Sequence, residues 1–291
     1  MTRSPFGFVR GAVLSLVALC AGCSVGSPWQ ELELDFRDGT PPIAELRAAS
    51  QQGDVTADFL LGLAYDTGTG VEPDLEQARR CYERAAEAGH PAAQNNLGML
   101  WFEGRGVPVS HAEARRWFEL AAAAGFAKAQ ANLGVLCLYG KDRDPEPRRG
   151  RDLVRRAADR GLPSAQAMLG SMYYEGFGVD RDRSLAARWY RRAAEQGVAM
   201  AQHRLALQYL HGDGVTADDA EGLRWLRAAA DRGHAASQHD LGLLYARGRA
   251  VPRDRELARR WLTLAAEQGF GAAQERLLAW NAAPPAAPVL R

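Results

Sequence analysis

The apolar residues of this chain follow one pattern that recurs every 36 residues over most of its length. Within a copy, Ala93, Leu97 and Trp101 are spaced by four residues, which places them on one helix face and does not fit the two-residue period of a strand. Further along, Trp117 and Ala121 mark a second apolar face with the same spacing. Each copy therefore predicts two amphipathic helices, and the array predicts a repeat architecture.

Several columns of the repeat hold the same kind of residue in nearly every copy. One column is leucine throughout, at Leu61, Leu97, Leu133, Leu169, Leu205, Leu241 and Leu277. Two more are mainly aromatic, with Tyr65, Trp101, Tyr173, Tyr209 and Tyr245 on the first helix and Trp117, Trp189, Trp225 and Trp261 on the second. We interpret both as core, packed where small residues let helix backbones approach closely, so no cofactor is needed to explain the tryptophans.

The predicted helix boundaries each have a local cause. The N-cap positions of the second helices are Asp74, Ser110, Glu146, Asp182, Asp218 and Asp254, and Gln77, Glu113 and Glu221 complete capping boxes. A glycine ends each second helix, at Gly53, Gly89, Gly125, Gly161, Gly197, Gly233 and Gly269, where a left-handed residue is favoured. The turn inside each copy carries paired glycines, such as Gly104 and Gly106, which indicates two positive φ angles.

The third copy departs from this pattern. Cys137 replaces the aromatic residue of the first helix, and Leu153 replaces the tryptophan of the second. Its turn, residues 141–147, lacks the second glycine and the valine that most other copies have. We therefore expect an irregular, more mobile connection at this point of the array.

The combined pattern A-x-x-x-L-G-x-x-Y-x-x-G-x-G-V, then A-x-x-W-x-x-x-A-A-x-x-G, resembles Sel1-like repeats. Residues 165–197 match it almost throughout, at Leu169, Gly170, Tyr173, Gly176, Gly178, Val179, Ala186, Trp189, Ala193 and Ala194. The resemblance covers residues 54–280 and implies an all-α fold, a right-handed αα-solenoid of six Sel1-like helix pairs with terminal capping half-repeats. It also implies an interaction scaffold similar to tetratricopeptide arrays.

On this reading, the six repeats occupy residues 54–269, between an N-terminal capping helix at 41–53 and a C-terminal capping helix at 270–280. Capping units are expected because the terminal repeats would otherwise expose their core faces. Residues 281–291 form a Pro/Ala-rich tail. Pro284, Pro285 and Pro288 are incompatible with a regular helix there.

The N-terminus, residues 1–22, resembles a bacterial lipoprotein signal peptide. Arg3 and Arg10 are basic, residues 11–19 are apolar, and a small-residue segment ends at Cys23. The resemblance implies that Cys23 is the lipid attachment site and that residues 23–40 are a tether. Cys20 stands where leucine is usual, so an ordinary signal peptide cut near residues 21–22 stays open.

These features predict a lipid-anchored protein of the bacterial cell envelope that faces the periplasm. Ser24 follows the predicted anchor, which by resemblance to enteric systems favours the outer membrane. The mature body contains only Cys81 and Cys137. Because they lie at least two helix spacings apart, further than a disulfide reaches, we predict that they do not pair.

The composition argues against nucleic-acid binding and against catalysis. The net charge is +1, and the arginines are spread over the helices instead of concentrated on one face. No nucleotide-binding, zinc-protease or serine-hydrolase motif is present. His203, His211 and His239, with Asp240, are the nearest candidates for a metal site. We interpret these histidines as surface residues and predict no metal, no cofactor and no enzymatic activity.

The candidate binding surface is the set of first-helix positions that the core does not dictate. In a solenoid of helix pairs the first helices line the concave surface that extended partners use. The predicted partner-binding groove comprises Asn95, Asn96, Phe102, Asn132, Tyr139, Met168, Tyr174, Glu175, His203, Arg204, His211, His239 and Arg247. Asparagines with exposed Phe102, Tyr139 and Tyr174 suit a peptide or loop, because amides hold a backbone and aromatic side chains anchor it.

By analogy with the family that the repeats resemble, the favoured function is a protein–protein interaction scaffold in an envelope assembly, secretion or polysaccharide-export complex. The alternative is a binder of cell-wall fragments or β-lactam-like ligands, a class for which weak hydrolase activity has been proposed in cysteine-rich relatives. Those relatives staple their helix pairs with regularly spaced cysteines. This chain has no such series of cysteines, which favours the scaffold.

Overall fold

The computed structural model describes residues 43–140 and 142–282, which contain fourteen α-helices and no strand. The helices are α3 (Ile43–Gln51), α4 (Val55–Thr67), α5 (Leu75–Glu87), α6 (Pro91–Glu103), α7 (His111–Ala123), α8 (Ala127–Tyr139), α9 (Pro147–Asp159), α10 (Pro163–Glu175), α11 (Arg183–Glu195), α12 (Ala199–His211), α13 (Asp219–Asp231), α14 (Ala235–Arg247), α15 (Arg255–Glu267) and α16 (Gly271–Ala282). The predicted signal peptide, its anchor Cys23, the tether and the Pro-rich end of the tail lie outside the described residues.

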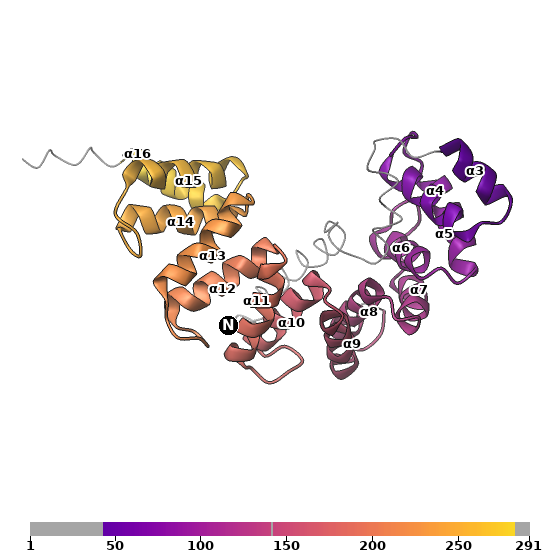
Figure 1. Ribbon diagram of the computed structural model, residues 1–291, viewed down its shortest axis with the longest axis horizontal. Helices are drawn as coiled ribbons and strands as arrows, with labels where there is room; N and C mark the ends of the chain where they lie inside the picture. The colour runs from indigo at the N-terminus through magenta and orange to yellow at the C-terminus, as the bar shows by residue number, and fades with distance from the viewer. Residues whose placement is uncertain (1–42, 141, 283–291) are drawn as a thin grey trace, which may run out of the picture. The chain divides into compact units, whose positions relative to one another are not determined.

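The helices alternate between the two predicted kinds. The six repeats begin at α4, α6, α8, α10, α12 and α14, and each is completed by the helix that follows. The chain divides into two compact units, residues 1–165 and 166–291, with the boundary inside α10. Within each unit, a first helix packs against the second helix of its own repeat and of the repeat before, as for α6 with α7 and α5 (Figure 1).

The leucine, alanine and aromatic columns form the core of each unit, as the periodicity predicts. In the first unit one buried cluster joins Leu97, Ala86 and Trp117. In the second unit the corresponding cluster joins Leu205 and Trp225 with neighbouring alanines. Burial of these columns is the main favourable term that holds adjacent helices together.

Small residues are required where helices cross. A Cβ atom on Gly98 would lie 2.6 Å from Phe118 Cε1, and one on Gly170 would lie 2.7 Å from Tyr190 Cδ1. Neither ring can move away, because Phe118 and Tyr190 are each 1% exposed. The glycine column therefore sets how closely the first helix of a repeat approaches its second helix.

The N-cap prediction is confirmed for five second helices, at Asp74, Ser110, Asp182, Asp218 and Asp254. Only half of each predicted capping box forms: Ser110 and Asp218 accept the N–H of Glu113 and Glu221, but the reciprocal bond to the N-cap N–H is absent. The N-cap backbone N–H donates instead to the carbonyl of the aromatic-column residue, as from Ser110 to Trp101 at 2.9 Å and from Asp218 to Tyr209 at 3.0 Å. This bond closes the turn between the two helices. The N-cap N–H is therefore already paired, and the side chains of Glu113 and Glu221 cannot accept a hydrogen bond from it.

Candidate functional site

The predicted groove positions in the first unit lie on neighbouring first helices but are partly used by packing. Asn132 Nδ2 donates to Asn95 Oδ1 at 2.9 Å and lies 3.5 Å from Met99 Sδ. Asn95 is only 4% exposed, while Asn96 is half-buried. The amides of Asn95 and Asn132 therefore join α6 to α8, and Asn96 presents more of its side chain.

The aromatic residues of this surface are half-buried, so the expectation that they are exposed is wrong, while their role as anchors stays a prediction. The Phe102 ring lies 5.1 Å from the His111 ring and packs on the core cluster of α7 and α8. Burial raises the pKa of Tyr139 to about 12. The Tyr174 hydroxyl donates to Asp213 Oδ2 at 2.9 Å, and Arg183 lies 5.4 Å from its ring centroid.

The remaining predicted positions differ in exposure. Met168, 3% exposed, and His203, 9% exposed, are buried. Arg204 and His239 are half-buried, whereas Glu175, His211 and Arg247 are exposed. The interpretation of the histidines as surface residues is therefore wrong for His203 and holds for His211. The three exposed residues of this predicted surface are each the last residue of a first helix.

The second unit brings three histidines and a carboxylate together. His203 Nε2 lies 2.8 Å from Asp240 Oδ2, and His239 Nδ1 lies 2.9 Å from Asp240 Oδ1. The His203 ring also lies 5.0 Å from that of His234. His203 and His239 stand at the same position of neighbouring repeats, and both contact Asp240, whereas His234 was not among the predicted residues.

The electrostatics of this cluster follow from burial and the two histidine contacts. Burial raises the pKa of the Asp240 carboxyl, but hydrogen bonds from His203 and His239 outweigh it and hold the pKa well below its usual range. Burial, and then the charge of His203, lowers the pKa of His234 to about 4. His234 Nδ1 also accepts the Ser237 N–H at 3.3 Å as the N-cap of α14, which requires the neutral ring.

No group of three or more potential ligands that could hold a metal ion occurs in residues 43–140 and 142–282. The helices in this part of the chain are all too short or too polar to span a membrane. Cys81 and Cys137 are buried and free, which confirms that they do not pair. Burial raises the pKa of both thiols.

Comparison with known families settles the class of the protein. The model of the Sel1 repeat matches the chain six times in succession, at residues 55–90, 91–126, 127–162, 163–198, 199–234 and 235–270. The chain belongs to the Sel1-repeat family. The predicted resemblance is confirmed, and so is the all-α solenoid of six Sel1-like helix pairs.

Two solved structures are similar to this Sel1-repeat chain. A Sel1 repeat protein from Oxalobacter formigenes is 30% identical with a TM-score of 0.72, over 82% of this chain and 97% of the other. A protective antigen of uropathogenic Escherichia coli strains is 36% identical with a TM-score of 0.73, over 81% of this chain and 50% of the other. The present chain thus spans about half the length of the E. coli protein. No curated protein matches the chain.

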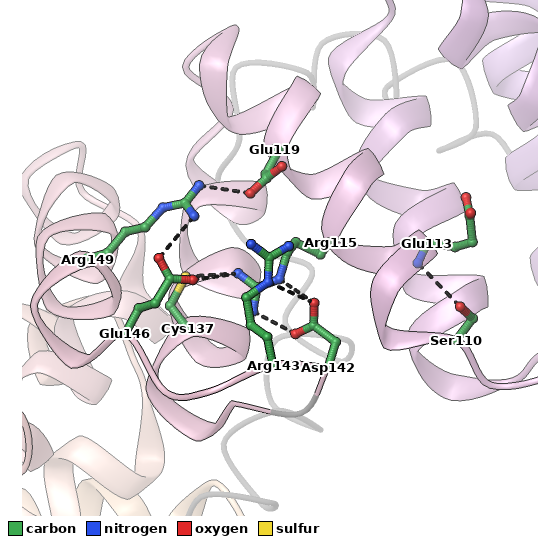
Figure 2. Close-up of polar contacts among 9 residues, drawn as sticks. All are labelled: Ser110, Glu113, Arg115, Glu119, Cys137, Asp142, Arg143, Glu146 and Arg149. Atoms are coloured by element: carbon green, nitrogen blue, oxygen red, sulfur yellow. Dashed lines mark hydrogen bonds and ion pairs between the residues drawn. The ribbon is translucent and has the colours of Figure 1, made fainter.

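The irregular third repeat surrounds a buried arginine of this Sel1-repeat protein. Arg115 of α7, whose side chain is 1% exposed, donates from Nε and Nη2 to the two carboxylate oxygens of Asp142, both at 2.6 Å (Figure 2). Arg115 Nη1 also lies 3.3 Å from Cys137 Sγ and 3.4 Å from Glu146 Oε1. Arg149 continues the network from Glu146 to Glu119.

This network explains how the turn departs from its neighbours. Asp142 stands in the column of the second turn glycine, and its backbone does not adopt a positive φ. The hydrogen bond from Arg115 holds the pKa of the Asp142 carboxyl below its usual range. Glu146, the expected N-cap of α9, makes no capping hydrogen bond with its side chain. The irregular connection is confirmed, while its greater mobility stays a prediction.

Sequence reasoning missed Arg115 because arginine in an amphipathic second helix is ordinarily a solvent-exposed residue. Two residues of the third repeat could have indicated that Arg115 is buried. Cys137 leaves space where the other repeats have an aromatic ring, and Asp142 places a carboxylate where a glycine is usual. Taken together, a missing volume and a new charge indicate that a cation enters the interior at that point.

Proposed function

We propose that this chain is a non-enzymatic protein–protein interaction scaffold of the bacterial cell envelope, which binds a protein partner along its first helices. The Sel1-repeat fold supports the interaction role. Its place in the envelope rests on the N-terminal segment that ends at Cys23.

The observation that carries the proposal is a column that packing leaves unconstrained. The last residue of each first helix is Thr67, Glu103, Tyr139, Glu175, His211 or Arg247, which are five residue types in six repeats. Tyr139 is half-buried, and the other five are exposed. The leucine column, by contrast, is uniform. An exposed column of varied chemistry next to a uniform core is suited to recognition, because its side chains can change without disturbing the fold.

The envelope location has two supports. The basic, apolar and small-residue segments before Cys23 have the order of a lipoprotein signal, with Cys23 as the acylated residue. The similar E. coli protein is a protective antigen. An antigen that confers protection is met by antibodies, which supports a surface or envelope setting for this chain as well.

Partner binding is tested by crosslinking intact envelopes and purifying the protein with what is attached to it. Substitution of Glu175, His211 and Arg247 by alanine together is expected to remove a stoichiometric protein partner while the helical circular dichroism is unchanged. The matched control replaces Arg188, Glu195 and Arg260, which are exposed on second helices. Equal loss in both triple variants, or retention of muropeptides without any protein partner, would count against the scaffold.

The half-buried Tyr139 and Tyr174 are tested separately, since both also contribute to packing. Their replacement by alanine is expected to weaken capture of the partner and leave the helical content intact. Unaltered capture would place the interface away from these two rings.

The anchor is tested by metabolic labelling with palmitate. The chain with Cys23 is expected to incorporate the label and to fractionate with the outer membrane. The Cys23→Ser variant is expected to lose the label. Label retained in that variant, or absent from both chains, would show that Cys23 is not the lipid attachment site.

A further inference from the structure

A surface hollow of about 680 Å³ lies between α7 and α9, on the second-helix side of the third repeat. It is lined by Glu119, Ala122, Ala123, Leu133, Arg149, Asp152, Leu153 and Arg156. All of these residues belong to the first unit. None of them is a predicted groove residue, so the hollow is separate from the first-helix surface considered above.

The hollow occupies the place where regular repeats hold an indole ring. Leu153 stands in the tryptophan column, at the position of Trp117 and Trp225 in the second and fifth repeats. Trp117 packs in one core cluster with Ala86 and Leu97, and Trp225 packs in another with Ala194 and Leu205. These alanines and leucines are in the columns of Ala122 and Leu133, two of the residues that line the hollow. The third repeat therefore keeps the alanine and leucine that contact the indole in other repeats, but it has Leu153 in place of the tryptophan.

Arg156, which lines the hollow, stands at the same position of the repeat as an arginine that lies over a tryptophan ring elsewhere in the chain. In the fourth repeat, the Arg192 guanidinium lies 4.5 Å from the centroid of Trp189. Arg156 and Leu153 are the residues at these two positions in the third repeat. Arg156 is exposed, so its guanidinium is available to cover an aromatic ring that enters the hollow.

The charge around the hollow indicates which residues would lie next to a bound aromatic side chain in the sequence of a partner. Helix α9 carries five arginines and two aspartates. Glu119 is paired with Arg149 at 2.8 Å, and Asp152 is paired with Arg151 at 2.9 Å. The excess positive charge of α9 therefore favours carboxylates beside the incoming ring.

We propose that this hollow is a docking site for an aromatic side chain of a partner protein, flanked by acidic residues. The ring replaces the missing indole between Ala122, Leu133 and Leu153, and Arg156 stacks on its exposed face. The carboxylates next to the ring lie near the arginines of α9. The partner thereby completes the tryptophan column of the scaffold.

The probe is the peptide acetyl-Glu-Trp-Glu-amide, with 5-fluorotryptophan at its centre, observed by ¹⁹F relaxation on addition of the purified protein. Binding is expected at millimolar peptide, together with a higher melting temperature of the protein. The analogue with alanine in place of tryptophan is expected not to compete. Absence of binding at that concentration, or competition by the alanine peptide, overturns the proposal.

Leu153→Trp inserts the indole that neighbouring repeats carry, and it is expected to weaken peptide binding by at least about tenfold because the hollow is then full. Arg156→Gln is expected to weaken binding about threefold through loss of the stacked cation. Its matched control is Arg192→Gln, at the same column where a tryptophan is already present, which is expected to leave binding unchanged. Leu153→Ala keeps the hollow open and is expected to retain binding.

The proposal is overturned if Leu153→Trp is folded by circular dichroism and still binds as the parent does. It is equally overturned if Arg156→Gln and Arg192→Gln affect binding alike. Should Leu153→Trp fail to fold, the arginine pair and Leu153→Ala decide the question on their own.

Discussion

The third and fifth repeats solve the same packing problem with opposite choices of side chain. In the fifth repeat, Tyr209 fills the interior and faces the second helix that carries Ala187, whereas in the third repeat Cys137 is small and Arg115 reaches inward from the corresponding position of α7. Large and small residues have been exchanged across the helix interface. The comparison indicates that packing constrains the summed volume of facing positions more strongly than it constrains either column.

The exchange has an electrostatic consequence that the regular repeat lacks. An aromatic ring needs no counter-charge in the interior, but a buried guanidinium does. Asp142 supplies that charge by replacing a turn glycine. Two departures from the repeat, Cys137 and Asp142, are therefore coupled through Arg115, and a salt bridge stands here where the fifth repeat has an aromatic ring.

The largest expected effect comes from breaking this salt bridge. Arg115→Ala leaves the Asp142 carboxylate buried without its main partner, which is expected to cost about 3–5 kcal/mol of unfolding free energy. The matched control is Arg79→Ala in the first repeat. Arg79 stands in the same column, but its side chain is 23% exposed and pairs with Glu76 and Glu83 on its own helix surface. Urea denaturation of the two variants measures the difference.

We expect the control to lose less than about 1 kcal/mol, as surface pairs do. Similar losses for Arg115→Ala and Arg79→Ala would mean that the buried network contributes nothing beyond an ordinary surface pair.

The second effect compares two capping histidines that share a column, His90 and His234. His234 faces His203, with Asp240 and Arg204 nearby, and its pKa is lowered to about 4 by burial and then by His203. Burial alone lowers the pKa of His90, whose ring stacks on Phe59 with 4.6 Å between centroids. The unfolded chain, with an ordinary histidine pKa near 6.5, therefore binds more protons than the folded chain as pH falls from about 6.5 to 4.

Stability is thus lost on acidification, and His234 is expected to account for roughly 2–3 kcal/mol of the loss between pH 7.5 and 4.5. His234→Asn keeps a capping side chain and removes this part of the loss, while His90→Asn removes less. Denaturation curves at the two pH values decide between them. The hypothesis fails if His234→Asn loses as much stability on acidification as the parent.

The third effect concerns the glycine column, which we expect to be required equally in the irregular third repeat and in the regular fourth repeat. A Cβ on Gly134 of the third repeat would lie 2.7 Å from Val154 Cγ2, as close as the one on Gly170 to Tyr190. Gly134→Val and Gly170→Val are therefore both expected to cost about 2–3 kcal/mol by overpacking. Gly271, with no atom within 4 Å of its added Cβ, is the control position. An unchanged melting curve for either core variant would refute the close-approach argument.

The smallest effect concerns the coupling itself. Cys137→Tyr alone is expected to cost about 1–2 kcal/mol, because Arg115 already occupies the space. In the background of Arg115→Ala and Asp142→Gly, which introduces the residues found at the equivalent positions Ala187 and Gly214, the same substitution is expected to be stabilising. A double-mutant analysis by urea denaturation gives the interaction energy, and strictly additive values would show that the positions are independent.

Prediction from the sequence succeeded where one residue type answers one local requirement. The N-caps at Asp74 and Ser110 needed only a short polar side chain before an amphipathic run. Prediction from the sequence was less successful where acceptors from two different segments compete for one N–H group. The capping box at Glu113 is only half formed, because the Trp101 carbonyl, brought near by the turn, accepts the N–H of Ser110.

The candidate surface shows the same limit. Counting positions along a helix placed Asn95, Met168 and His203 on the first-helix surface, but neighbouring helices cover them. Glu175, His211 and Arg247, each the last residue of its helix, are exposed. Burial by a neighbouring repeat depends on the distance between helices, which a periodic pattern does not contain.

The sequence alone was sufficient to predict the family, the helix pairs and the core columns. It did so through the 36-residue period, the helical spacing of the apolar residues and the boundary glycines, which are short-range properties repeated in every copy. Only the folded chain decided that Arg115 lies inside, that Asp240 gathers His203 and His239, and that Leu153 leaves a hollow. Those features join residues from different repeats, and they depend on how much volume and charge one helix presents to the next.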